Sequence, residues 1–298
     1  MTIGIISYNR KEMLEKCLYC IYATSTDEER DIIIWDNAST DDSQAFLGTV
    51  LDWPGVRVIQ SDKNIGTECV FEMMKLVTTP YAFFLDCDCW VETIGWVNNI
   101  VKVYEADSTI AAVGLVPRID DRARMGVTWE GIDYDKFVPP QKFRCENVNF
   151  RKPIEIPDFK DGMMDDMYHK RIAGIIMIYA PIGASIPGRP FAGTGMSYRV
   201  DLVRNCEFRP SSGILTDVGN LYSEYLLKTR PQSTYGWLHD HGFYHATGPW
   251  WNMGNMEVFY QEKSKRAPEI YNRSYEWQYG WFENAKKWSG WGRSLPKQ

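Results

Sequence analysis

The first 116 residues alternate short apolar strands with amphipathic helices, and this alternation restricts the possible folds more than any other feature of the chain. The expected strands cover residues 2–8, 31–35, 56–60, 81–85 and 110–116, and the expected helices cover residues 11–23, 65–77 and 93–104. Strands this apolar are buried on both faces. Alternating strands and helices are joined by right-handed crossovers into a parallel sheet. The sequence therefore predicts an α/β fold with a mostly parallel sheet flanked by helices.

The rest of the chain divides into three parts. Residues 117–190 are rich in proline and contain an acidic run at 158–166, so an irregular insertion or cap is expected there. Regular structure is expected to return at residues 191–203, followed by a helix at 217–228 that Thr216 caps and a strand at 236–245. Residues 249–298 hold half of the twelve Trp. We expect one domain over residues 1–248, with residues 1–116 as its ligand-binding half, and an aromatic-rich C-terminal extension.

Charge and cysteine content exclude several classes of protein. A net charge of −6 argues against broad, sequence-independent binding to nucleic acid, which requires Lys and Arg to neutralise phosphates. Seven Cys at irregular spacing do not form a disulfide framework and suit a reducing compartment. We expect no signal peptide and no transmembrane segment, because no basic and apolar leader and no uninterrupted apolar run of membrane-spanning length is found. The expected location is the cytoplasm.

Polar clusters follow three of the predicted strands, at residues 7–10, 36–39 and 86–88. Ligands of open parallel sheets bind in the crevice outside the carboxyl ends of the strands. Turn formation and helix capping explain each cluster alone, but explain three together less well. We therefore expect the clusters to form one binding edge.

The pair Asp86-x-Asp88 directly follows an apolar strand and could hold a divalent cation. Mg²⁺ and Mn²⁺ prefer carboxylate, phosphate and water oxygens, and such an ion would neutralise the charge on a leaving diphosphate. The chain has neither a G-x-G-x-x-G after the first strand nor a G-x-x-x-x-G-K-[ST] motif. These absences argue against NAD-dependent and P-loop proteins.

Four segments in order resemble the GT-A glycosyltransferases of family 2: ISYNR at 6–10, IIIWDNASTDDS at 32–43, DKNIG at 62–66 and FFLDCDCWV at 83–91. The resemblance resumes weakly in FAGTGMSYR at 191–199 and in 242–245. It implies a GT-A fold and the inverting transfer of a sugar from a UDP- or GDP-sugar to an acceptor hydroxyl, assisted by Mn²⁺ or Mg²⁺. The acceptor is left open: a glycan, lipid, protein, small molecule or modified nucleic-acid base.

The resemblance also implies roles for individual residues. Asp36 would bind the nucleotide base, Asp86 would face the ribose and the metal, and Asp88 and His245 would bind the metal. Gly193 and Gly195 would lie on the acceptor side. The other residues expected at the donor are Ser7, Tyr8, Arg10, Ser39, Asn64, Gly66 and Cys87.

The general base is predicted to be Asp217, which lies where the family carries its acids at the start of a helix. An Asp in the first turn of a helix is also favoured by the helix dipole alone. Glu224, on the same predicted helix face, is a weaker candidate, and Asp165 and Asp166 from the insertion are further alternatives.

Other interpretations remain open at this point. His239, His241 and His245 have even spacings that would place them on one face of a strand, so a zinc site is an alternative, although Gly242 is expected to interrupt that strand. Trp277, Trp281, Trp288 and Trp291 fit one helix face, which could pack on the core or bind an acceptor. The competing functions are a nucleotidyltransferase and a catalytically silent nucleotide-sugar-binding or scaffold protein.

Overall fold

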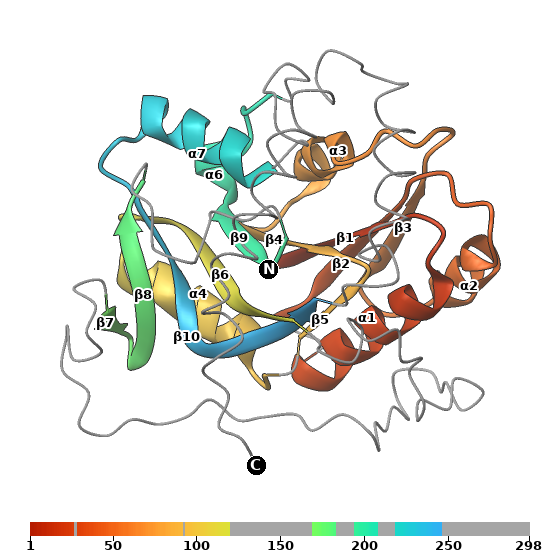
Figure 1. Cartoon of the computed structure of the whole chain (residues 1–298), viewed down its shortest axis with the longest axis horizontal. Coiled ribbons are helices and arrows are strands. Elements are labelled where there is room, and N and C mark those ends of the chain that lie inside the picture. The colour runs from red at the N-terminus through yellow and green to blue at the C-terminus, as the bar shows by residue number, and fades with distance from the viewer. Residues whose placement is uncertain (27–28, 92, 120–168, 183–193, 208–217, 246–298) are drawn as a thin grey trace, which may run out of the picture.

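The computed structural model describes residues 1–26, 29–91, 93–119, 169–182, 194–207 and 218–245, which form one ten-stranded sheet and its covering helices (Figure 1). The strands are β1 (Thr2–Ser7), β2 (Asp31–Asp36), β3 (Val56–Gln60), β4 (Tyr81–Asp86), β5 (Cys89–Val91), β6 (Ile110–Ile119), β7 (His169–Ile172), β8 (Ile175–Pro181), β9 (Met196–Arg199) and β10 (Thr234–His245). The helices are α1 (Lys11–Thr24), α2 (Ser43–Val50), α3 (Glu68–Leu76), α4 (Trp96–Ala106), α6 (Val200–Val203) and α7 (Val218–Thr229).

The sheet has the order β3-β2-β1-β4-β9-β6-β10-β8-β7, and β5 pairs separately with β10. Strands β3, β2, β1 and β4 are parallel neighbours, and β6 is parallel to β10. Strand β9 lies antiparallel between β4 and β6, so β4 and β6 still run in the same direction. The predicted mostly parallel α/β sheet is confirmed.

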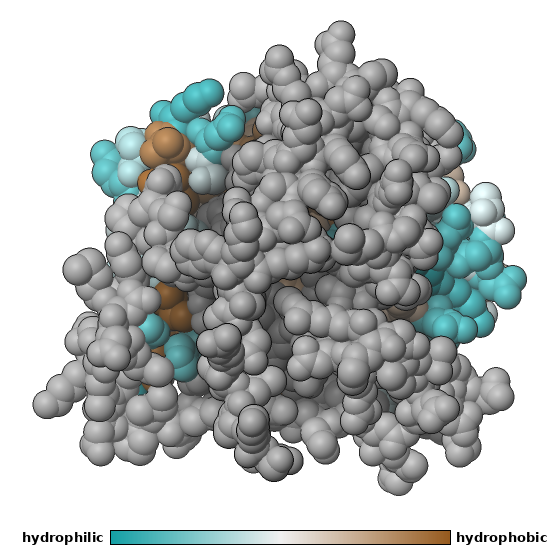
Figure 2. Space-filling model, viewed as in Figure 1, coloured by the Kyte–Doolittle hydropathy of each residue, from teal (hydrophilic) through white to brown (hydrophobic). Residues whose placement is uncertain are grey.

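Helices cover both faces of the sheet, with α1, α2 and α4 on one side and α3, α6 and α7 on the other (Figure 1). Strand β2 shows why its sequence is continuously apolar. Ile32 and Ile34 belong to the core under α1, α2 and α4, whereas Ile33 and Trp35 belong to the core under α3 and α7. A strand buried on both faces needs no polar alternation. The described outer surface over α2 is mainly hydrophilic (Figure 2).

Several element boundaries differ from the prediction for local reasons. The helix expected from residue 65 begins at Glu68, because Gly66 adopts a left-handed φ of 62°. The helix expected from residue 93 begins at Trp96, after Gly95 with a φ of 76°. Helix α2 and strand β5 were not predicted, since α2 follows a turn rich in Asp, Ser and Thr and β5 has only three residues.

Gly242 was expected to interrupt the last strand. Strand β10 instead continues to His245 and contains a bulge just before Gly242. Its pairing with β6 jumps from Leu238↔Leu115 to Gly242↔Val116, so three consecutive β10 residues oppose no residue of β6.

Part of the predicted irregular insertion also joins the sheet, because β7 and β8 pair with each other and β8 pairs with β10. Residues 249–298 and their predicted Trp face lie outside the described residues. None of the described helices has the length and apolar character needed to cross a membrane.

Gly114 on β6 tests how tightly the middle of the sheet is packed. A Cβ at this position would lie 2.2 Å from Sδ of Met196 and 2.8 Å from the ring of Trp237. We expect Gly114→Ala to lower the free energy of unfolding by about 1–3 kcal/mol, the usual cost of overpacking. Urea denaturation measures this change.

Gly48 provides the matched control, because it is exposed on α2 and a Cβ there meets no atom within 4 Å. Gly48→Ala should stabilise the protein by about 0.5–1 kcal/mol, since alanine costs less backbone entropy in a helix. Equal effects of the two substitutions would contradict the packing described for β6.

Candidate active site

Strand pairing brings the three predicted polar clusters to one edge of the sheet. Ser7 is the register partner of Asp36 across β1 and β2, and Ile6 is the partner of Asp86 across β1 and β4. Ser7 and Asp36 are fully buried, and Asp88 is 6% exposed. The edge is therefore a place where polar side chains are held away from bulk water, as a binding site requires.

Asp36 has one carboxylate oxygen in use and one available. Its Oδ1 accepts a hydrogen bond from the backbone N–H of Ser39 at 3.1 Å. Its Oδ2 is buried and has no hydrogen-bond partner among the described residues. A buried polar atom without a partner is costly, so such atoms are concentrated where a ligand completes them.

The turns after β1 and β2 are held together by side chains. The N–H of Asn9 donates to Oγ of Ser39 at 2.9 Å, and the N–H of Thr40 donates to Oδ1 of Asn9 at 2.6 Å. Asn9 and Ala38 both adopt left-handed φ values, of 51° and 64°. Non-glycine residues are uncommon in this region and occur where surrounding contacts hold them, often at functional sites. Ser39 therefore has a visible structural role at the predicted site.

Asn37 connects this edge to the loop after β3, although it was not among the predicted site residues. Its Nδ2 donates to the carbonyl of Gly66 at 3.0 Å, and its Oδ1 accepts from the N–H of Ile65 at 3.2 Å. Asn64 in turn accepts from the N–H of Gly66 at 2.8 Å. The predicted loop residues Asn64 and Gly66 are thus held next to the turn after Asp36. The sequence signal was present, since Asn37 directly follows Asp36.

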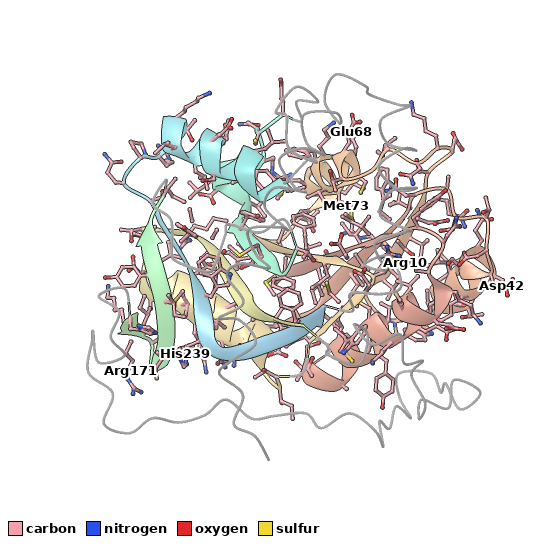
Figure 3. The ribbon with its side chains drawn as sticks, in the orientation of Figure 1. Arg10, Asp42, Glu68, Met73, Arg171 and His239 are labelled. Atoms are coloured by element: carbon pink, nitrogen blue, oxygen red, sulfur yellow. The ribbon has the colours of Figure 1, made fainter. Side chains whose placement is uncertain are left out.

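Arg10 pairs with Asp88: its Nη1 donates to Oδ2 of that carboxylate. Both side chains are largely buried, at 24% and 9% exposure. Burial lowers the pKa of Arg10, but the negative field of Asp88, Cys87 and Asp86 outweighs it and the net pKa is raised. Arg10 was predicted to contact the donor, and the structure shows that it also neutralises Asp88. Figure 3 shows it at the end of the sheet, above α1.

Asp86, Asp88 and Cys89 form a group in which one potential metal-ligand atom from each residue lies within 4.8 Å of the others. Cys87, which lies between the two acids, is not in this group; it is buried and, like Cys89, belongs to the core cluster under α1. Burial and the charge of Asp88 raise the pKa of Cys87 to about 12. The charge of Arg10, a residue of the same edge, also acts on this thiol, and the donor role of Cys87 remains a prediction.

The predicted acceptor-side loop touches the same acids through Thr194. Its hydroxyl accepts from the N–H of Asp86 at 3.0 Å and lies 3.5 Å from Sγ of Cys89. Gly195 next to it donates from its N–H to the carbonyl of Phe84 at 2.7 Å, with a φ of 71°. A Cβ on Gly195 would lie 2.3 Å from the ring of Phe243. The flanking glycines were predicted from the sequence but Thr194 was not, because a lone Thr carries no distinctive pattern.

His245 is placed by its backbone. It is the register partner of Cys89 where β10 pairs with β5, one residue beyond Asp88.

Of the other predicted site residues, some are exposed and some lie outside the described ranges. Tyr8 is 41% exposed, and Glu224 is exposed on α7. Gly193, Asp217, Asp165 and Asp166 lie outside the described residues, although α7 begins at Val218, directly after Asp217.

The histidines of the zinc alternative have different surroundings. The ring of His239 lies 5.6 Å from that of His169, whereas Nε2 of His241 is 2.8 Å from Nδ2 of Asn99. His239 lies beside Arg171, far from Arg10 in the same view (Figure 3). In the described part of the chain, the metal-ligating groups of three or more residues include neither histidine. The side chain of His245, the third histidine, lies outside the described part of the chain, so the zinc alternative remains an untested prediction.

The fold matches solved glycosyltransferase structures. The structure of residues 1–349 of S. aureus TarS in complex with UDP-GlcNAc aligns with a TM-score of 0.53 at 11% identity, covering 82% of this chain and 57% of that one. The UDP complex aligns with a TM-score of 0.53 at 12% identity, covering 87% and 62%. The chain thus spans less than two thirds of these proteins. No curated protein matches it.

These matches define the class of fold, which is that of the GT-A glycosyltransferases. The model of glycosyl transferase family 2 matches residues 2–163, more than half of the chain. The chain belongs to glycosyl transferase family 2.

Replacing Arg10 tests the electrostatics of the acidic group. We expect Arg10→Met to lower the free energy of unfolding by about 3 kcal/mol in EDTA, because it leaves the buried Asp88 carboxylate without its cation. This expected loss is at the low end of the range for breaking a buried ion pair, because the Arg10 side chain is partly exposed.

The control is Lys75→Met, which breaks the exposed pair with Glu72. It should cost less than about 0.5 kcal/mol. Guanidinium denaturation of both variants provides the comparison. Indistinguishable losses would show that Asp88 does not depend on Arg10.

Proposed function

We propose that this chain transfers a sugar from a nucleotide-diphosphate sugar to an acceptor hydroxyl with inversion at the anomeric carbon. The observation that carries the proposal is the fully buried Asp36 carboxylate, whose Oδ2 has no described partner, at the same sheet edge as Asp86 and Asp88. Family membership supports the reaction class. Oδ2 of Asp36 can accept a hydrogen bond from a nucleotide base, and Asp86 and Asp88 can hold a cation that binds phosphates. A site of this kind suits a nucleotide diphosphate.

The donor base would bind to Asp36. An N–H of uracil or guanine donates to Oδ2 of Asp36, and the exposed ring of Tyr8 at the neighbouring turn offers an apolar face for the base. A UDP-sugar is the first donor to test, since the TarS structure of the same fold was solved with UDP-GlcNAc. Gly66 lies beside the turn after Asp36 through its hydrogen bond with Asn37, and Asn64 accepts from the N–H of Gly66 in the same loop.

The residues present fit a divalent cation. Asp86 and Asp88 supply carboxylate oxygens, which Mn²⁺ and Mg²⁺ both accept, and the register of β10 with β5 brings the His245 backbone beside them. When bound, the ion would offset the charge that develops on the diphosphate leaving group. Arg10 holds Asp88 in position and contributes a second positive charge near the diphosphate.

The transfer itself is a single displacement. The acceptor oxygen forms a bond to the anomeric carbon while the bond from that carbon to the diphosphate oxygen breaks, and the nucleotide diphosphate leaves with the electron pair. The acceptor proton passes to the Asp217 carboxylate as general base. In the sequence, Asp217 directly precedes Val218, where α7 begins, and this supports the proposed role.

The compartment proposed for this reaction is the cytoplasm. The described cysteines are all free and buried, which suits a reducing environment. The acceptor class follows from no described residue, so it is to be identified by assay of glycans, lipids, proteins and small molecules.

The donor proposal is tested by Asp36→Asn. Thermal stabilisation by UDP- and GDP-sugars with and without Mn²⁺ identifies the donor, because a ligand that binds the native state raises its stability. Calorimetry should then show that Asp36→Asn weakens donor binding by about 1.5–3 kcal/mol, the worth of a hydrogen bond to a charged group.

The control is Asp42→Asn, which changes an exposed carboxylate in the same turn region without a side-chain cap bond (Figure 3). It should leave the Kd unchanged. Donor affinity that survives in folded Asp36→Asn protein would remove Asp36 from the base-binding role.

The base is tested by Asp217→Asn, which should lower kcat by about 10²–10⁴-fold while the donor Kd stays the same. The comparison variant is Glu224→Gln, on the exposed face of α7. If Glu224→Gln loses turnover and Asp217→Asn keeps it, the base is Glu224. If the unaltered chain binds the donor but transfers no sugar to any acceptor or to water, it is a binding protein.

A further inference from the structure

Cys89 is a third potential ligand in the acidic group, and neither the sequence motif nor the proposed transfer reaction uses it. Its Sγ lies with carboxylate oxygens of Asp86 and Asp88 in a group whose atoms are all within 4.8 Å of one another. Its side chain is fully buried at the start of β5. A sulfur ligand would change which cations the site prefers.

The two oxygens of Asp88 face different partners. Oδ2 pairs with Arg10, while Oδ1 lies 3.9 Å from Sγ of Cys89. An ion bound at about 2.1 Å from oxygen and about 2.3 Å from sulfur, with the two ligands this far apart, would subtend an angle of roughly 125°, which is close to tetrahedral or trigonal values. One cation therefore fits between Oδ1 and Sγ while Arg10 keeps its contact with Oδ2.

Two features outside the acidic pair point to the same place. The Thr194 hydroxyl, which accepts from the N–H of Asp86, lies 3.5 Å from Sγ of Cys89. Independently, the antiparallel pairing of β5 with β10 makes His245 the register partner of Cys89. Sheet pairing thus adds a histidine backbone beside the thiol. A thiolate beside carboxylates is a ligand set of zinc-like cations rather than of Mg²⁺.

We propose that Cys89 supplies a thiolate ligand to the cation held by Asp86 and Asp88, so that this site selects thiophilic divalent cations over Mg²⁺. The proposal rests on the metal site of the proposed function and adds a residue and a selectivity to it. When the ion binds, the thiol proton is released to the solvent and the sulfur forms the bond to the metal. The predicted order of affinity places Mg²⁺ last, below Mn²⁺, with Co²⁺, Zn²⁺ and Cd²⁺ bound more tightly.

The experiment is a Co²⁺ and Cd²⁺ titration of the whole chain, followed by near-ultraviolet absorbance, in a Cys145→Ser background. This background is used because Cys145 lies outside the described residues, whereas the six described thiols are all buried. A thiolate bound to Co²⁺ or Cd²⁺ gives a charge-transfer band that carboxylate ligands do not give. We expect this band to saturate at one ion per chain.

Cys89→Ser should remove the band and weaken Cd²⁺ binding at least tenfold, roughly the loss that even outer-shell changes cause, while Mg²⁺ binding changes little. Cys17→Ser is the matched control, because Cys17 is another fully buried thiol in the same core cluster and is not in the ligand group. It should retain the band and the Cd²⁺ affinity.

Two results would overturn the proposal: no charge-transfer band when Co²⁺ or Cd²⁺ is bound to the folded parent chain, or a band that persists in folded Cys89→Ser protein. The first does not depend on a variant that has to fold. Calorimetry with UDP- and GDP-sugars separates this failure from that of the proposed function. Donor binding without the band rejects only Cys89, and the band without donor binding rejects only the donor proposal.

Discussion

The parallel pairing of β1 with β2 and β4 is the constraint on which the rest of the structure depends. These strands are buried on both faces, so their middle residues are restricted to apolar side chains. Polar groups can enter only where the strands end, and parallel pairing puts those ends together. Ser7 beside Asp36 and Ile6 beside Asp86 are the direct result. A single choice of strand direction thus concentrates the polar chemistry of this half at one edge.

That concentration creates an electrostatic problem, because Asp86 and Asp88 lie close together with little water around Asp88. Arg10 reduces this repulsion by pairing with one oxygen of Asp88. Burial first, and then the negative charges of Asp88 and Asp86, raise the pKa of the thiols Cys87 and Cys89, and the same charges raise the pKa of Arg10 against the effect of its burial. An edge of this kind attracts a further cation, which links the packing of the sheet to the metal chemistry proposed for it.

The sequence predicted β1 to β4, β6, the edge and the acidic pair because each is marked by a local pattern. It missed features that depend on side-chain direction or on distant pairing. Cys87 and Cys89 look equivalent in FFLDCDCWV, and both belong to the core cluster under α1, yet only the sulfur of Cys89 joins Asp86 and Asp88 in the ligand group. Arg10 was expected at the donor, and its pairing with Asp88 joins positions 78 residues apart, a contact that no local pattern shows. The β10 bulge at Gly242 was read as an interruption because local sequence does not show how far a partner strand continues.

Strand β9 gives the site a connection between its two sides. As an antiparallel strand between β4 and β6, it brings the preceding Thr194 and Gly195 onto the carboxyl end of β4. Thr194 then binds the backbone of Asp86, and Gly195 fits only because it lacks a Cβ against Phe243 on β10. Phe243 and His245 belong to the same strand segment, which pairs with β5. A shift of the acceptor-side loop would therefore act on Asp86 through one hydrogen bond and on the β5–β10 pairing through one ring contact. Paired strands thus connect the predicted donor side with the predicted acceptor side, which is the kind of support that the proposed displacement reaction needs to keep its reacting atoms aligned.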